Sequence, residues 1–137
     1  MGIFKRKKQE IIKHEWKIKK KCLDLILECA KSSYPKEFGG LLRVDTSDKY
    51  TIIELVVLPG TVSGDSHAIF NLHMLPIDFS IAGTVHSHPS YFARPSEADL
   101  HLFEKYGRVH IIAAYPFNEN SWQAYDYTGK DIEMKIV

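Results

Sequence analysis

The sequence has little cysteine and no long apolar run. Its two cysteines, Cys22 and Cys29, stand seven positions apart in what reads as one helix, roughly 10 Å apart along its axis. A disulfide needs closer Cα atoms, so both are expected to be reduced and buried on one helix face, in a cytoplasmic setting. No apolar stretch reaches the length of a membrane span, so none is predicted. The N-terminal stretch has no apolar core after its basic residues and carries Arg6 where myristoylation needs Ser or Thr, so neither secretion nor lipidation is expected.

Several metal-site patterns are also missing. The sequence holds no H-E-x-x-H helix and no P-C-x-x-C run, which excludes the common zinc-peptidase helix and the zinc base deaminases. With 137 residues the chain is one ordinary domain, too short for the barrels that carry many H-x-H hydrolase sites. The H-x-[DE] order of non-haem iron oxygenases is not the order found here.

The net charge of +1 conceals an uneven distribution. Residues 1–21 hold nine of the 18 basic residues and two of the 17 acidic ones, so they carry about +7 and the remainder about −6. We therefore divide the chain into a basic extension, residues 1–14, and one domain, residues 15–137. Such an extension can bind nucleic acid or another acidic partner, or can be a solvated tail. The sequence leaves open whether the protein is a monomer or a homodimer.

Hydrophobic periodicity predicts an α+β domain with a mixed β-sheet and flanking helices. Helices are predicted over residues 15–33 and 96–106, the second ended by Gly107. Strands are predicted over residues 37–44, 50–59, 67–73, 81–88, 108–116, 121–129 and 131–137, with the last two forming a hairpin.

His86 and His88 form the first candidate site. They stand two apart on a predicted strand, so both imidazoles leave the same side of it. Their Cα atoms are then less than about 7 Å apart, which suits two nitrogens on one zinc ion. A pair of surface histidines at a strand end would give the same pattern.

A carboxylate follows at the start of the next helix. Ser96 and Asp99 fit a capping box, which explains both residues structurally. The same helix start is also a rigid place from which to direct a carboxylate toward the two histidines. Two histidines and one aspartate leave a fourth position open, as in catalytic zinc sites. A base for the attacking water is then needed. Glu37, just before two glycines, is a candidate that spacing alone does not select among 17 acids.

The combined pattern resembles the JAMM motif of the JAB1/MPN/Mov34 metalloproteases. E-F-G-G-L-L is followed by H-S-H-P, by seven residues from Pro89 to Pro95, and by S-x-x-D, and the resemblance covers about residues 16–137. It implies an MPN/JAB1-like domain with layering like that of cytidine deaminases. It also implies the roles of the five motif residues: Zn²⁺ is held by His86, His88 and Asp99, Glu37 is the general acid/base, and Ser96 stabilises the oxyanion.

The resemblance further implies a substrate class. Small prokaryotic and archaeal members act on ubiquitin-like or sulfur-carrier proteins with Gly-Gly tails, as deubiquitinase-like isopeptidases. The segment before H-S-H-P is short here, which leaves selectivity among polyubiquitin linkages unassigned. Phe38, Ser90, Tyr91 and Arg94 flank the expected cleft and are predicted to grip the substrate tail. Two alternatives stay open: a non-catalytic MPN scaffold, and a nucleic-acid-associated JAB relative.

Other residues near the motif receive structural predictions. Ser87 is expected to point away from the metal and is given no chemistry. His101 should face away on its helix, and His110 is more often structural on a strand. Trp122 and Tyr125 are expected to pack in the core or on the sheet.

Overall fold

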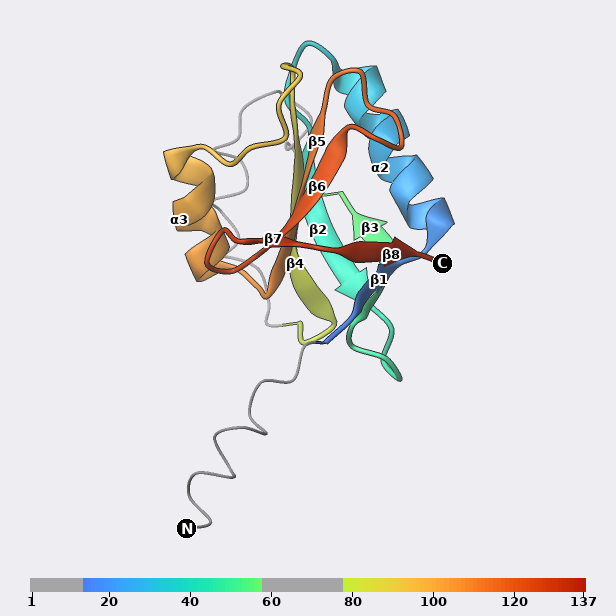
Figure 1. Ribbon diagram of the computed structural model, residues 1–137. Coiled ribbons are helices and arrows are strands. Elements are labelled where there is room, and N and C mark those ends of the chain that lie inside the picture. Colours follow the sequence, from blue (N-terminus) through green and yellow to red (C-terminus); the bar gives the residue numbers. More distant parts are fainter. Residues whose placement is uncertain (1–13, 58–77) are drawn as a thin grey trace.

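The computed structural model describes residues 14–57 and 78–137 (Figure 1). The predicted strand over 67–73 and nearly all of the basic extension lie outside the described residues. The elements in chain order are β1 (Trp16–Ile18), α2 (Lys20–Ser33), β2 (Gly39–Val44), β3 (Thr51–Val56), β4 (Ile81–His88), α3 (Glu97–Lys105), β5 (Val109–Ala114), β6 (Trp122–Asp126), β7 (Asp131–Ile132) and β8 (Met134–Ile136). This is the predicted α+β architecture.

The strands form one mixed sheet in the order β7-β6-β5-β4-β2-β3-β1-β8. The two helices lie on opposite sides of it (Figure 1). The side chains of β5 (Val109–Ala114) alternate between these two sides. Ile111 packs in the large core that contains α2, whereas Ile112 packs with Phe103 of α3. Because successive strand residues face opposite ways, each face is apolar and is covered by one helix.

The first strand corrects the prediction that the helix begins at residue 15. Trp16 and Ile18 are both buried while Lys17 between them is half-buried, which is the period of a strand rather than a helix. β1 pairs in parallel with β3 and with β8, and the helix starts only at Lys20. Tertiary pairing thus overrides the helical spacing that begins at residue 18.

The C-terminal hairpin was predicted only in part. Asp131 and Ile132 do pair antiparallel with β6. Residues 134–136 instead form β8, which adds to β1 at the opposite edge of the sheet. The last residues therefore join the two edges of the sheet, an arrangement that a local hairpin signal does not reveal.

β4 is the strand that positions the site, because it lies between β2 and β5 near the middle of the sheet. Close approach to β5 requires Gly83, where an added Cβ would lie 1.5 Å from the Val109 carbonyl oxygen. Gly107 turns the chain from α3 into β5 with a φ of 100°, a value that favours glycine. The predicted helix end at Gly107 is confirmed.

The cysteine prediction also agrees with the structure. Cys22 and Cys29 are both free, with Cys22 buried and Cys29 partly buried against the same core. Burial raises the pKa of the Cys22 thiol to about 12, which keeps it protonated and unreactive. Among the described residues, no helix has the length and apolarity needed to cross a bilayer.

Candidate metal centre

His86 and His88 leave β4 on the face covered by α3. Val85, one position earlier, packs in the core beneath α2, so the alternation places both imidazoles on the other side. The Nε2 atoms of the two rings lie 3.2 Å apart. The side chain of His86 is 2 % exposed and that of His88 is 16 % exposed, so this is not a pair of freely exposed surface histidines. The predicted convergence is confirmed.

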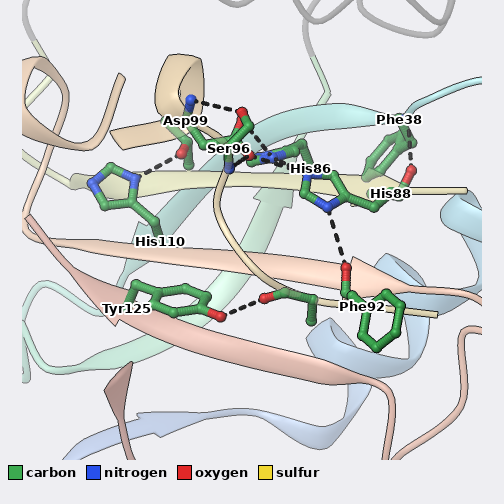
Figure 2. A network of polar contacts seen from close by, with 11 residues as sticks. Phe38, His86, His88, Phe92, Ser96, Asp99, His110 and Tyr125 are labelled. Atoms are coloured by element: carbon green, nitrogen blue, oxygen red, sulfur yellow. Dashed lines mark hydrogen bonds and ion pairs between the residues drawn. The ribbon is translucent and has the colours of Figure 1, made fainter. Parts of the chain in front are cut away.

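Asp99 reaches the same point from the first turn of α3. Its Oδ1 lies 3.0 Å from His86 Nε2, and its Oδ2 lies 3.1 Å from His88 Nε2. The predicted capping box is also present: Ser96 Oγ accepts from the Asp99 backbone N–H at 3.1 Å, and Asp99 Oδ2 accepts from the Ser96 N–H at 2.8 Å. Figure 2 shows the two residues facing the histidines. The capping and metal-binding interpretations therefore hold together.

The three side chains fit a tetrahedral zinc ion. Bonds near 2.0–2.1 Å at tetrahedral angles separate ligand atoms by about 3.3 Å. The two Nε2 atoms lie 3.2 Å apart, and each lies close to a different oxygen of Asp99, His86 at 3.0 Å from Oδ1 and His88 at 3.1 Å from Oδ2. The ligand atoms of His86, His88 and Asp99 lie within 4.8 Å of one another, as a shared ion requires. Two imidazole nitrogens and one carboxylate oxygen are a donor set that zinc accepts, with one coordination position left over.

Electrostatics keep the carboxylate ionised. Burial raises the pKa of Asp99, but the hydrogen bonds from His86 and His88 outweigh it and hold the pKa well below its usual range. Burial lowers the pKa of His88, and the hydrogen bond and charge of Asp99 overcome this and raise it. The charged aspartate therefore attracts a cation to the site, either a proton on histidine or a metal ion. Metal and proton compete there, since a ligating histidine must be neutral.

The tautomer of His88 is fixed from outside the site. Its Nδ1 lies 3.3 Å from the Phe92 carbonyl oxygen, so an Nδ1–H donates there and leaves the Nε2 lone pair for a metal. Figure 2 shows this contact below the ligand cluster. The buried Nδ1 of His86 has no partner among the described residues.

Glu37 lies beside the ligand cluster through strand pairing. β2 runs antiparallel to β4 with Gly39 opposite His86, and the Phe38 carbonyl accepts from the Ser87 N–H at 2.8 Å, which brings the preceding Glu37 to the His88 end of β4. The Glu37 charge, after burial, Asp99 and the Phe92 carbonyl, also raises the pKa of His88. The residue is half-buried.

The loop from Pro89 to Pro95 forms one wall of the site and is held at three carbonyl groups. Besides Phe92, the Ser90 carbonyl accepts from the Tyr115 N–H at 2.8 Å, and the Ala93 carbonyl accepts from the Tyr125 hydroxyl. With the backbone fixed, side chains project outward: Tyr91 is 72 % exposed.

Three of the four predicted substrate contacts lie on this exposed loop. Ser90, Tyr91 and Arg94 are accessible, and the Arg94 guanidinium lies 5.7 Å from the centroid of the exposed Phe92 ring. Phe38 is different, because its side chain is 2 % exposed and packs in the core beneath α2. The prediction that Phe38 grips a substrate is therefore wrong, since it contacts the protein interior.

The structure shows two hydrogen bonds near the site that the sequence did not predict, one made by Tyr125 and one made by His110. Tyr125 combines predicted packing with the hydrogen bond to Ala93, and its ring stacks with Phe103. His110 is structural, as predicted: it is fully buried, stacks on Phe103 at 4.2 Å, and its Nδ1 lies 2.7 Å from Thr84 Oγ1. Strand register places Thr84 beside His110, a pairing that no local motif encodes.

A scan against protein families matches residues 19–125 to the model described as prokaryotic homologs of the JAB domain. The chain belongs to this family. A curated relative from Haloferax volcanii, named a probable metalloprotease, is 36% identical over 122 residues, which are 84% of this chain and 75% of the relative.

Solved structures agree. A structure described as a JAMM metalloprotease-like zinc site in the proteasome and signalosome matches with a TM-score of 0.70 and 39% identity, over 90% of this chain and 99% of that chain. A JAB1/MPN domain protein from Archaeoglobus fulgidus gives 0.70 and 38%, over 91% and 99%. Together with the His86–His88–Asp99 cluster, these likenesses make the protein a zinc metalloprotease of the JAMM type.

Proposed function

We propose that the protein hydrolyses the peptide or isopeptide bond that follows the Gly-Gly tail of a ubiquitin-like or sulfur-carrier protein. The burial of the ligands supports this substrate class. His86 and Asp99 are almost inaccessible and His88 is largely covered. A scissile bond must therefore reach the metal on a thin, extended segment. Glycine has no Cβ and suits such a passage.

In this proposal Glu37 and Ser96 both act on the substrate bound at the ligand cluster. Zinc, when bound, polarises the scissile carbonyl and lowers the pKa of water. Glu37, next to the Phe38 peptide that is hydrogen-bonded to Ser87, takes a proton from the attacking water and passes it to the leaving amine. Ser96 donates a hydrogen bond to the developing oxyanion.

The capping contact leaves Ser96 able to do this. In the capping box its oxygen accepts from the Asp99 N–H through a lone pair. The hydroxyl proton is a separate group that remains to be donated. Capping and oxyanion stabilisation thus use different parts of one hydroxyl and do not compete.

The exposed side chains of the 89–95 loop are placed to contact the substrate beyond its tail. We propose that Tyr91 and Arg94 do so, with Ser90 beside them, because the loop backbone is fixed at three carbonyls and joins His88 to Ser96. We also propose a cytoplasmic location, supported by two free cysteines.

The experiment compares two fusions of one ubiquitin-like protein that differ only in the tail, Gly-Gly or Ala-Ala. We expect zinc-dependent cleavage after Gly-Gly and at least tenfold slower cleavage after Ala-Ala. Glu37→Ala should abolish turnover with zinc retained, whereas Glu104→Ala, an exposed acid on α3, should not change it. Equal cleavage of both tails would refute the substrate class and leave the metalloprotease assignment intact.

The identity of the substrate can be sought directly. A Glu37→Ala variant still folds the metal centre and should retain its substrate from an extract of its own cells. We expect a small protein ending in Gly-Gly.

The alternative hypothesis of a nucleic-acid partner rests on the positive charge of the basic extension. Deleting residues 1–14 tests it: salt-dependent DNA binding that is lost on deletion would support that partner, and its absence in the full chain would reject it.

A further inference from the structure

Ser87 lies between the two ligand histidines and was expected to have no role. Its side chain does leave the other face of β4, and the residue is 1 % exposed. Its hydroxyl oxygen accepts a hydrogen bond from the Phe38 backbone N–H at 2.8 Å. Its own N–H donates to the Phe38 carbonyl, also at 2.8 Å. Ser87 therefore binds both polar backbone atoms of the residue that follows Glu37.

This contact replaces part of the strand ladder. In a regular antiparallel pair, the Phe38 N–H would donate to the Ser87 carbonyl. Here a side-chain oxygen takes the place of that carbonyl. The regular pairing of β2 with β4 runs only as far as Gly39 and His86. The path of the chain through Phe38, and hence the direction of Glu37, is set at this point by the serine hydroxyl.

The Phe38 side chain provides the second fixed point. It is 2 % exposed and packs in the core beneath α2. Its peptide is held by Ser87 and its ring by the core, so the adjacent Glu37 has little backbone freedom. Two neighbours of Ser87, His86 and His88, hold the metal. One segment of β4 thus carries two of the three ligands and contacts the residue next to the base.

We propose that Ser87 is a positioning residue whose hydroxyl, through the Phe38 peptide, aligns the Glu37 carboxylate with the His86–His88–Asp99 cluster. The proposal rests on the metalloprotease activity and on the role of Glu37 as base, and not on which protein is the substrate. A displacement of about 1 Å at a reacting group can lower a rate about 100-fold, so a lost backbone contact beside the base is expected to be measurable.

The test uses three variants. Ser87→Ala removes the hydroxyl, Ser87→Thr keeps it in a residue favoured in strands, and Thr51→Val is the matched control. Thr51 is also buried in the sheet and donates its hydroxyl to Asp48 at 2.7 Å, but it lies on β3, away from the metal centre. Loss of the Thr51 hydroxyl in Thr51→Val should lower the stability of the protein without altering turnover.

The first measurement needs no metal. Amide hydrogen exchange of the metal-free protein should show the Phe38 N–H protected in the wild type, in Ser87→Thr and in Thr51→Val, and exchanging at least tenfold faster in Ser87→Ala. Unchanged protection in Ser87→Ala would overturn the claim that the hydroxyl holds this peptide.

The second measurement separates the base from the ligands. Ser87→Ala should lower kcat about 10- to 100-fold with KM within twofold, bind one zinc, and give an unchanged Co²⁺ absorption spectrum, because the ligands stay in place. Ser87→Thr should return kcat to within about threefold of wild type. Turnover of Ser87→Ala within twofold of wild type, a shifted Co²⁺ spectrum, or no rescue by Thr would each overturn the proposal. Since all ratios use one substrate that the wild type cleaves, failure of the Gly-Gly proposal would leave this comparison valid.

Discussion

Ser96 is bound into the first turn of α3 and is proposed to contact the reacting carbonyl, and a series of substitutions can separate these roles. The hydroxyl accepts from the Asp99 N–H at 3.1 Å. Ser96→Ala leaves that N–H without its cap, which costs about 1 kcal/mol and should lower Tm by about 4 °C for a domain of this size. Ser96→Gly also lacks the hydroxyl but costs only a few tenths of a kcal/mol at an N-cap.

Thermal stability and turnover should therefore rank the variants in different orders. Losing one oxyanion donor lowers kcat by about 100- to 1000-fold, so Ala and Gly should be equally inactive although Gly is nearly as stable as wild type. Ser96→Thr should keep both stability and most of the turnover. Thermal unfolding and steady-state kinetics, with zinc content measured for each variant, supply the comparison. If Ser96→Gly turns over like wild type, or if kcat simply follows Tm across the series, the hydroxyl serves only as a cap.

Four further outcomes are expected. Removing zinc with a chelator should abolish turnover, and restoring zinc at 1000 times its Kd should stabilise the fold by about 4 kcal/mol, seen as a rise in Tm; a Tm indifferent to zinc would contradict the site. Glu37→Gln should lower kcat by about 100- to 10,000-fold with zinc retained; zinc loss in this variant would make Glu37 a ligand. Tyr125→Phe, which frees the Ala93 carbonyl, should destabilise by about 1 kcal/mol in urea unfolding, whereas Tyr127→Phe at an exposed position should not. Burial lowers the pKa of His110 to about 4, below the unfolded value near 6.5. Between these two pH values the unfolded chain binds a proton at this residue that the native state does not bind. The free energy of unfolding therefore falls as the pH is lowered, by about 3 kcal/mol in all. The free energy of unfolding of metal-free wild type, taken relative to metal-free His110→Phe, should show this fall, and a difference independent of pH would refute it.

Local spacing made the metal ligands plausible, and the family resemblance assigned them. The strand period brings His86 and His88 to one face, and the capping box fixes Ser96 and Asp99 relative to one another. Both are relations within a few residues. These two spacing relations do not depend on the fold of the rest of the chain. For this reason the ligand set could be proposed before the fold was known.

Non-local pairing accounts for what local spacing missed. Glu37 is brought toward the ligand strand only by the pairing of β2 with β4, which begins at Gly39 and His86. Residue chemistry alone did not select it from the other acids; the family resemblance did. The contact of Ser87 with the Phe38 peptide also depends on this non-local pairing, so the sequence did not predict it. Residues 16–18 were predicted as helix because the apolar spacing from Ile18 onward is helical. They form a strand because β1 pairs with β3 and β8, from distant parts of the chain. Phe38 was assigned to the substrate because its neighbour is in the site, although alternation sends its ring into the core.

The spacing of Ser96 and Asp99 has a physical reason that joins fold to function. The N-cap and N3 positions of a helix are the pair whose side chains and backbone N–H groups can bind one another. At N3 the shorter aspartate keeps its carboxylate close to the backbone, where Oδ2 accepts from the Ser96 N–H at 2.8 Å while Oδ1 faces His86 at 3.0 Å. A buried carboxylate with two fixed partners loses little freedom when a metal binds. The helix start therefore supplies a ligand that is already oriented, and it places the Ser96 hydroxyl beside that ligand without an additional structural element.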